Sequence, residues 1–154
     1  MYKRISILFV LLICTIMTSC NKGTTEIPED VLNLFDTYMS AYEMGVEESV
    51  KYAHFESDVI RKAYLESGDK LLDYEVEDIE KINDNLYAFT ILVKTMQTND
   101  AYLRAYNFVA LIDNTWRYTN HVDHIPAYLK DNLDEKKYSY GFGLGSGLDD
   151  EGLS

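Results

Sequence analysis

Hydrophobic residues in the first third of the chain recur at the three- and four-residue spacing of a helix. The stretch from Pro28 to Gly45 carries them on one side of that helix: Val31, Leu34, Phe35, Tyr38, Met39 and Tyr42. A second helical stretch is predicted over residues 46–54. Ser57 is a good N-cap for a third helix, which the pattern ends before Gly68.

After Gly68 the spacing changes from helical to alternating. Leu72, Tyr74 and Val76 alternate with acidic residues, which predicts a strand with one solvated face. A turn at residues 83–85 leads into a second strand over residues 86–97. That strand is apolar at both sets of alternate positions, which is typical of a central strand covered on both sides.

Two further strands follow with short polar turns between them. Asn99 and Asp100 precede a strand over residues 102–112, and Asp113 and Asn114 precede one over residues 115–124. Consecutive strands joined by such turns predict an antiparallel meander. A short helix after Pro126 is expected to close the domain.

Helices followed by a meander define an α+β domain, with N-terminal helices packed on a curved antiparallel sheet. The element order, with the turn and strand start Asp-Asn-Thr-Trp-Arg-Tyr at residues 113–118, resembles the nuclear transport factor 2-like superfamily over roughly residues 29–126. Cystatin-like folds share this pattern. The resemblance implies a cone-shaped domain, and the enzymes of the superfamily use a carboxylate or histidine base with a tyrosine or second acid inside the cone.

The N-terminus has the features of an export signal. Lys3 and Arg4 precede an uncharged, largely apolar run of 13 residues, 5–17. A membrane-spanning helix needs about 20 residues, so this run predicts a secretory signal. The following Met-Thr-Ser-Cys resembles the lipobox of bacterial lipoproteins, which implies diacylglycerol on Cys20 and cleavage before it. The alternative is an ordinary signal peptide that ends near a cysteine.

These features predict four segments. Residues 1–19 form the signal peptide and 20–27 the lipidated cysteine with a short linker. Residues 28–137 form a single domain, and 138–154 a glycine-rich acidic tail that is expected to be disordered. Alternate aromatic residues at the start of the tail offer an adhesive segment as the alternative. The protein is therefore expected at the cell membrane, lipid-anchored and facing outside the cytoplasm.

The charge narrows the choice of partners. The chain has 26 acidic and 14 basic side chains, and loss of the leader with Lys3 and Arg4 leaves 26 against 12, a net charge of −14. Such a domain is expected to bind no nucleic acid and to be repelled by anionic lipid headgroups. Membrane attachment would then come from acyl chains on Cys20.

Few catalytic chemistries fit this sequence. Cys14 would leave with the leader and Cys20 would carry lipid, so no thiol nucleophile, cysteine metal site or disulfide is expected in the domain. The sequence has no nucleotide-binding loop, HExxH helix, calcium loop or Gly-x-Ser-x-Gly elbow. No cofactor is expected.

Candidate ligand-binding side chains lie mainly on the predicted strands. They are Tyr74, Tyr87, Arg104, Tyr106, His121 and Asp123, and Tyr42 is a further tyrosine that can line a cavity. The alternative for the tyrosines is core packing, and for Arg104 an ion pair with an acid on the neighbouring strand. A metal site at His121, Asp123 and His124 would require the last strand to break near residue 122.

The hypothesis from the sequence is a membrane-anchored extracytoplasmic lipoprotein with a non-catalytic domain that binds a small molecule or a protein. The alternative is a small isomerase or dehydratase that uses the cone as its active site. A deep cavity with a carboxylate or histidine in hydrogen-bond contact with a tyrosine would favour the enzyme. The apolar faces of the second and third strands also suggest a homodimer.

Overall fold

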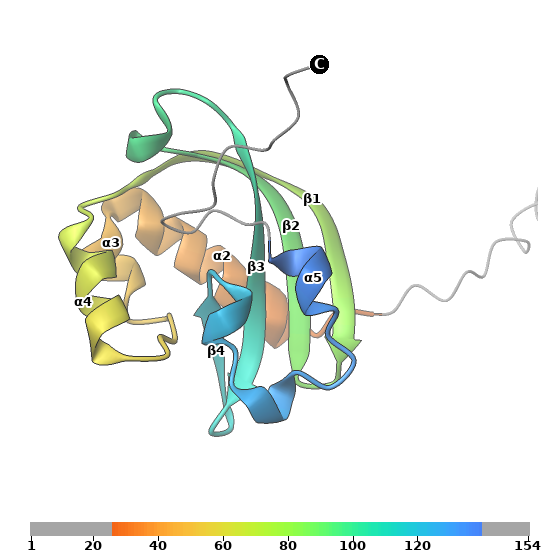
Figure 1. Cartoon of the computed structure of the whole chain (residues 1–154). Helices are drawn as coiled ribbons and strands as arrows, with labels where there is room; N and C mark the ends of the chain where they lie inside the picture. The colour runs from red at the N-terminus through yellow and green to blue at the C-terminus, as the bar shows by residue number, and fades with distance from the viewer. Residues whose placement is uncertain (1–25, 140–154) are drawn as a thin grey trace, which may run out of the picture.

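The computed structural model describes residues 26–139, which form helices followed by a single sheet (Figure 1). The helices are α2 (Glu29–Met44), α3 (Val46–Ser49), α4 (Asp58–Glu66) and α5 (Glu135–Tyr138), and the strands are β1 (Leu71–Asn83), β2 (Leu86–Thr95), β3 (Leu103–Ile112) and β4 (Thr115–Thr119). The four strands are antiparallel and lie in the order β1-β2-β3-β4. This confirms the predicted α+β class and the meander.

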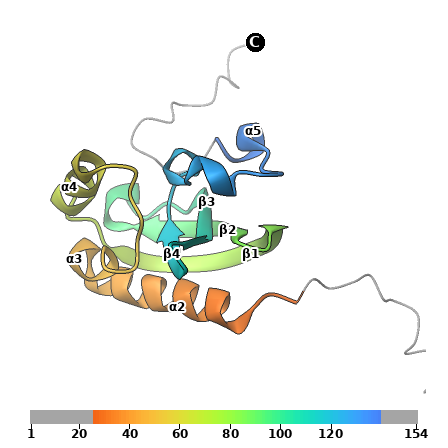
Figure 2. The ribbon, with the colours of Figure 1, turned by 90° about the horizontal axis from the view of Figure 1, so that it is seen from below.

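The sheet separates two layers (Figure 2). Helix α2 packs on one side, which we call the helix face, and residues 122–138 cover part of the other, which we call the C-terminal face. The long strands curve (Figure 1), and β1 pairs with β2 through three register irregularities. Such bulges bend and twist a strand, so they contribute to this curvature.

The core of the helix face follows the predicted amphipathic pattern of α2. Phe35 stacks on Phe89 with ring centroids 4.2 Å apart, and Tyr38 stacks on Tyr118 at 3.5 Å. Helix α2 ends at Gly45 as predicted, where φ is 132°, a backbone conformation that favours glycine. These contacts fix α2 across the sheet.

The core of the C-terminal face is formed on the opposite side of the two central strands, β2 and β3. Leu86 and Phe108 are fully buried there under side chains from residues 122–138. Strand β2 is therefore covered on both sides, which confirms the prediction. Tyr138 belongs to this core and is 2% exposed, so the packed region continues one residue beyond the predicted domain end at 137.

The predicted helix over residues 46–54 is wrong beyond its first turn. Helix α3 ends at Ser49, and Ala53 forms a parallel bridge with Tyr118 on β4. The His54 amide donates to the Tyr118 carbonyl at 2.7 Å, and the Tyr118 amide donates to the Tyr52 carbonyl at 2.9 Å. The backbone groups of residues 52–54 that bond to Tyr118 are not available for helical hydrogen bonds. A tertiary contact of this kind overrides local helix propensity.

Three strand predictions also need correction. The second strand was expected to reach residue 97, but β2 ends at Thr95, and Met96–Thr98 forms a 3-10 turn. The last strand was expected to reach residue 124, but β4 ends at Thr119, and Val122–His124 forms a 3-10 turn. In β1 a bulge near its start buries Leu71 and leaves Leu72 48% exposed, which reverses the faces predicted there. The turns at residues 83–85, 99–100 and 113–114 are confirmed.

Candidate functional site

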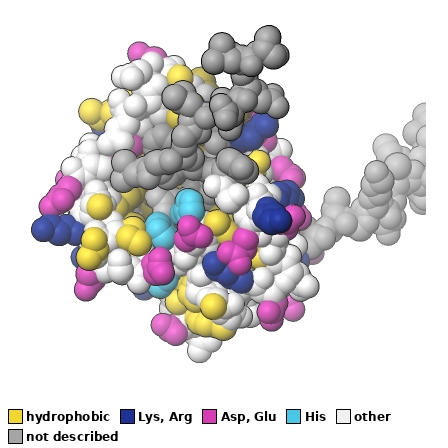
Figure 3. Space-filling model, in the orientation of Figure 1, with side chains coloured by type: hydrophobic (Ala, Val, Ile, Leu, Met, Phe, Trp, Pro, Cys, Tyr) yellow, Lys and Arg dark blue, Asp and Glu magenta, His cyan; other side chains and the backbone are white. Residues whose placement is uncertain are grey.

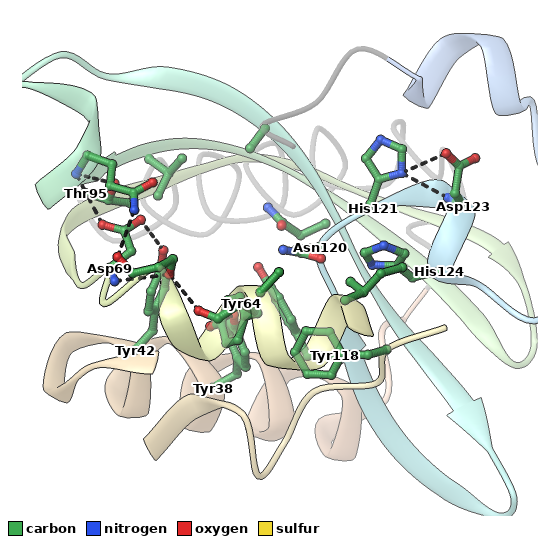
Figure 4. Close-up of a pocket in the computed structure, with 18 of the residues that line it drawn as sticks. Tyr38, Tyr42, Tyr64, Asp69, Thr95, Tyr118, Asn120, His121, Asp123 and His124 are labelled. Atoms are coloured by element: carbon green, nitrogen blue, oxygen red, sulfur yellow. Dashed lines mark hydrogen bonds and ion pairs between the residues drawn. The ribbon is translucent and has the colours of Figure 1, made fainter. Parts of the chain in front are cut away.

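A cavity of about 600 Å³ lies on the helix face, between α2, α4, the sheet and the 3-10 turn after β4. Its walls are largely aromatic and apolar, with side chains from Tyr38, Tyr42, Phe55, Tyr64 and Tyr118. Figure 4 shows two polar ends joined by these rings: Asp69 and Tyr42 lie toward one end, and the two histidines lie toward the other. This volume is in the usual range for a small-molecule pocket.

Helix α4 forms one wall of the cavity. Ser57 caps it by accepting a hydrogen bond from the Ile60 amide at 3.3 Å, and Gly68 turns the chain at a φ of 59°. The cavity is lined by Val59, Ile60, Ala63 and Tyr64 of α4, yet no residue of the helix is fully buried, and Val59 is 78% exposed. Because the apolar side of α4 faces a cavity and not a packed core, its side chains stay partly exposed to solvent.

Three hydroxyl groups form a chain behind the aromatic wall. The Tyr38 and Tyr64 hydroxyls lie 2.7 Å apart, and the Tyr64 hydroxyl lies 2.7 Å from Ser49 Oγ. Ser49 Oγ donates to the Val46 carbonyl at 3.4 Å, so all three hydroxyl hydrogens can be used within this chain. Burial raises the pKa of Tyr38 and of Tyr64, which keeps both phenols neutral. The chain holds the rings of this wall in place.

Asp69 lies at one end of the cavity and is only 4% exposed. Its Oδ2 accepts a hydrogen bond from the Tyr42 hydroxyl at 2.7 Å, and its Oδ1 accepts one from the Gln97 amide at 3.2 Å. Burial and the Asp69 carboxylate together raise the pKa of Tyr42, so its proton stays on the phenol. The ion pairs within residues 26–139 do not include Asp69.

The histidines lie at the other end, beside hydrophobic and acidic side chains at the surface (Figure 3). His121 Nδ1 accepts a hydrogen bond from the Asp123 amide at 3.2 Å and lies 3.3 Å from Asp123 Oδ2. The rings of His121 and His124 are 5.7 Å apart. Burial lowers the pKa of His124, and the neighbouring His121 lowers it further, so His124 is neutral at neutral pH.

Three buried polar atoms on this cavity have no hydrogen-bond partner within the described part of the chain. They are Asn107 Nδ2, Asn120 Oδ1 and His124 Nδ1. Asn107 is paired with Phe89 in the β2–β3 register, so it lies on the helix face. An unsatisfied buried polar group costs about 1–3 kcal/mol, so these three atoms are available for hydrogen bonds to whatever occupies the cavity, water or a ligand.

Two of the predicted ligand-binding residues, His121 and Asp123, line the cavity, and so does Tyr42. Tyr74 and Tyr87 belong to the helix-face core but not to the cavity wall: Tyr74 packs edge-on against Phe35, and Tyr87 packs edge-on against Trp116.

Arg104 and Tyr106 lie on the C-terminal face, away from the cavity. Arg104 makes a two-bond ion pair with Glu77, at 2.7 and 2.9 Å, and Tyr106 packs edge-on against Tyr138. The expected ion pair of Arg104 is confirmed, but its partner lies on β1, one strand beyond the neighbouring β2. Cys20 lies outside the described residues.

Asp69, Asn107 and Asn120 line the cavity but were not among the residues predicted for the site. Asn107 carried a usable signal, because it is an isolated amide in a strand that is otherwise apolar on that face. His124 was considered as a metal ligand and, in preference, as a partly exposed residue at a strand end; no metal site was predicted. Within residues 26–139 no three His, Cys, Asp or Glu side chains are close enough to hold a metal ion.

A second hollow, of about 700 Å³, lies between residues 50–61 and the β3–β4 turn. It is more open to solvent than the first and is lined by polar and charged side chains, among them Lys51, Arg61 and Arg117. Lysine and arginine are absent from the described lining of the first cavity. The two hollows therefore differ in electrostatic character.

Comparison of the sequence with models of known protein families finds no match, and comparison with curated proteins finds none either. Among the helices of residues 26–139, none is long and apolar enough to cross a membrane.

Proposed function

We propose that this protein is a membrane-anchored extracytoplasmic lipoprotein whose domain binds a small molecule in the cavity of the helix face without transforming it. The observation that carries the proposal is a set of three buried atoms that have no hydrogen-bond partner among residues 26–139: Asn107 Nδ2, Asn120 Oδ1 and His124 Nδ1. All three residues line one cavity with mainly aromatic and apolar walls. Such a pocket, apolar with a few convergent polar groups, is the usual form of a ligand site.

We also propose that the domain is related to the nuclear transport factor 2-like superfamily. The order of helices and strands supports this relationship, and so does the position of the cavity between the helices and a curved sheet. The relationship concerns the fold, and the function rests on the side chains of the site.

The anchor rests on the sequence around Cys20, which lies outside the described residues. Mass spectrometry of the protein from its native envelope is expected to find Cys20 as the first residue, with fatty acids attached. The Cys20→Ser variant should accumulate uncleaved and unlipidated. A native protein that keeps its first 19 residues, or that carries no acyl chain, would contradict the anchor.

The binding proposal is tested by screening uncharged and charged fragments against the full chain, with NMR shifts or thermal stabilisation as the readout. Binding fragments are expected to protect or shift residues of the cavity wall. Asn107→Leu removes one of the unpartnered groups and is expected to abolish binding, while Asn83→Leu, remote from the cavity, keeps it. Fragments that bind both variants equally would contradict the site.

A second candidate function is proton transfer by a small isomerase or dehydratase. The Tyr42 hydroxyl lies 2.7 Å from the Asp69 carboxylate, which is the contact between a tyrosine and a carboxylate that such an enzyme needs. However, Asp69 already accepts two hydrogen bonds, and Tyr42 donates its hydrogen to Asp69. The free groups are His124 Nδ1 as a base and Asn107 Nδ2 as a donor to a developing oxyanion.

Deuterium exchange at the carbon next to the carbonyl of cyclic ketones, followed by NMR, separates the two functions. The binding proposal expects no exchange above the buffer rate. Exchange that the protein accelerates and that His124→Gln abolishes would favour the enzyme.

A further inference from the structure

The buried carboxylate of Asp69 is the most unusual charge in the described chain. Asp and Glu side chains are almost never fully buried unless a cation or metal pairs with them. Asp69 is 4% exposed, and its two partners, the Tyr42 hydroxyl and the Gln97 amide, are neutral donors. These bonds orient the carboxylate, but within residues 26–139 no cationic side chain pairs with its negative charge.

The surroundings of Asp69 favour a cation. Tyr42 lies beside Tyr38 and Tyr64, with ring centroids at 5.9 and 6.4 Å, and Phe55 packs against Tyr64 at 5.1 Å. The faces of aromatic rings attract cations through their quadrupole. The described wall of the cavity carries no lysine or arginine to balance an anionic ligand, and the chain as a whole has a net charge of −12.

We infer that the ligand is an organic ammonium ion whose charged nitrogen is bound at Asp69 between the tyrosine rings. This inference rests on the proposed binding function and names its ligand class. The rest of the molecule would run along the aromatic wall toward Asn107, Asn120 and His124, where the unpartnered atoms call for both hydrogen-bond donors and acceptors. Anionic ligands, such as carboxylates and phosphates, are disfavoured at this site.

Three probes with the same aromatic body test the inference on the full chain in detergent. They are 2-phenylethylammonium, 2-phenylethanol and 3-phenylpropionate, which carry a positive, a neutral and a negative head. Calorimetry or NMR titration is expected to give an affinity for the ammonium at least about tenfold above that for the alcohol, which corresponds to one charge-assisted contact. The carboxylate is expected not to bind.

Substitutions then assign the preference to Asp69. Asp69→Asn keeps a hydrogen-bonding side chain of the same shape and should bring the ratio between ammonium and alcohol close to one. Asp123→Asn, which removes the other carboxylate of the cavity wall, should keep the ratio, because the Asp123 side chain is 68% exposed and screened by water.

If Asp69→Asn does not fold, Tyr42→Phe provides the test. That variant retains the ring and the carboxylate and frees one carboxylate lone pair, so the preference for the ammonium should persist or increase. Loss of the preference in Tyr42→Phe, or an unchanged preference in Asp69→Asn, would overturn the inference.

The probes also separate this inference from the proposed function. If 2-phenylethanol binds in the cavity as tightly as the ammonium, the inference fails and the binding function stands. If none of the three probes binds, the inference fails as well, and the fragment screen with Asn107→Leu decides the binding function.

Discussion

The two faces of the sheet are built from alternate residues of the same strands, yet they differ in how they are filled. On the C-terminal face, Leu86, Ala88 and Phe108 are at most 2% exposed under side chains of residues 122–138. On the helix face, α2 fills one part with stacked rings, and the cavity occupies the rest. The close-packed face is expected to contribute most to stability, and the partly hollow face carries the proposed binding site.

The position of the covering elements explains this difference. The C-terminal segment folds directly onto β2 and β3, whereas α4 lies away from the sheet and buries none of its own residues (Figure 2). A wall that is set back leaves space between itself and the sheet. Asn107 and Phe108 are adjacent in β3 and belong to the two different faces, so the comparison can be tested with neighbouring residues.

The largest expected effect is on the close-packed face. Phe108→Ala removes a fully buried ring that packs edge-on against Tyr138, and it is expected to lower the free energy of unfolding by about 3–5 kcal/mol. Urea unfolding followed by circular dichroism measures the change. Tyr128→Ala, at a 64% exposed aromatic residue, is the control and should change stability by less than about 0.5 kcal/mol. Equal losses in both variants would refute the assignment of this core.

On the helix face, a substitution at the cavity is expected to raise the free energy of unfolding. Asn107→Leu replaces a buried amide whose Nδ2 has no partner in the described part of the chain, so stability is expected to rise by about 1–2 kcal/mol while ligand binding is lost. Asn83→Leu is the matched control, since its Nδ2 donates to the Leu129 and Asp131 carbonyls at 3.1 and 3.0 Å. That variant should lose about 1–2 kcal/mol. A destabilised Asn107→Leu would mean that Asn107 has a structural role.

A smaller loss is expected where the C-terminal face meets solvent. The Tyr138 hydroxyl donates to Glu80 Oε2 at 2.5 Å, so Tyr138→Phe should cost about 1 kcal/mol, reduced by the exposure of Glu80. Lys137 and Tyr138 hold the pKa of Glu80 below its usual value, so this contribution is present above the carboxyl's unfolded pKa and fades as pH falls. A double-mutant cycle with Glu80→Gln measures the coupling, and additive losses would contradict the contact.

The smallest effect concerns His124 in the hollow. Its pKa is lowered from 6.5 by burial and by His121, against opposing effects of Glu56 and Asp123. The unfolded chain therefore binds more protons, and stability should fall as pH drops below the unfolded pKa. The half-buried ring limits this loss to less than about 1 kcal/mol between pH 7.5 and pH 5.5.

His124→Gln should reduce the slope of stability against pH over that interval. The pKa of His54 is also lowered, and because His54 is present in both proteins, the difference between them isolates His124. Identical slopes in the two proteins would show that His124 titrates normally.

The expected homodimer stays a prediction. It was suggested by apolar residues on both faces of the second and third strands, and in the structure the chain's own helices and C-terminal segment cover much of both faces. The uncovered part of the C-terminal face includes the ion pair of Arg104 with Glu77. Sedimentation of the full chain determines the oligomeric state.

Local patterns were sufficient wherever a residue's neighbours in sequence are also its neighbours in space. The stripe of α2 and the Asn and Asp turns were predicted correctly, and the left-handed backbone of Asp113 and Asn114 matches the turn read from the sequence. The prediction failed at residues 50–54 and at the end of β4. At residues 52–54 the backbone partner, Tyr118, lies more than sixty residues away along the chain, and no local pattern reports it. After Thr119 the backbone turns back on itself through the bonds from the His124 amide to the His121 carbonyl and from the Ile125 amide to the Val122 carbonyl.

For the site, the sequence predicted some of the residue types but not which strand face lines the cavity. His121 and Asp123 were singled out from residue type and do line the cavity, although a 3-10 turn positions them instead of a strand face. Arg104 and Tyr106 are two residues apart on β3 and therefore share a strand face, but that face is the one opposite the cavity. Alternation assigns residues to two sets and does not say which set faces the helices.

The sequence by itself determined the α+β class, the first helix of the domain, the meander and the acidic charge, because each depends on residue type and short-range spacing. Only the tertiary structure decided that the helix face is partly hollow, that Asp69 is buried, and that Asn107, Asn120 and His124 converge on one cavity. Whether a space is filled depends on how elements that are distant in sequence pack against each other. That arrangement depends on the packing of the whole domain and is not encoded in any one stretch of the chain.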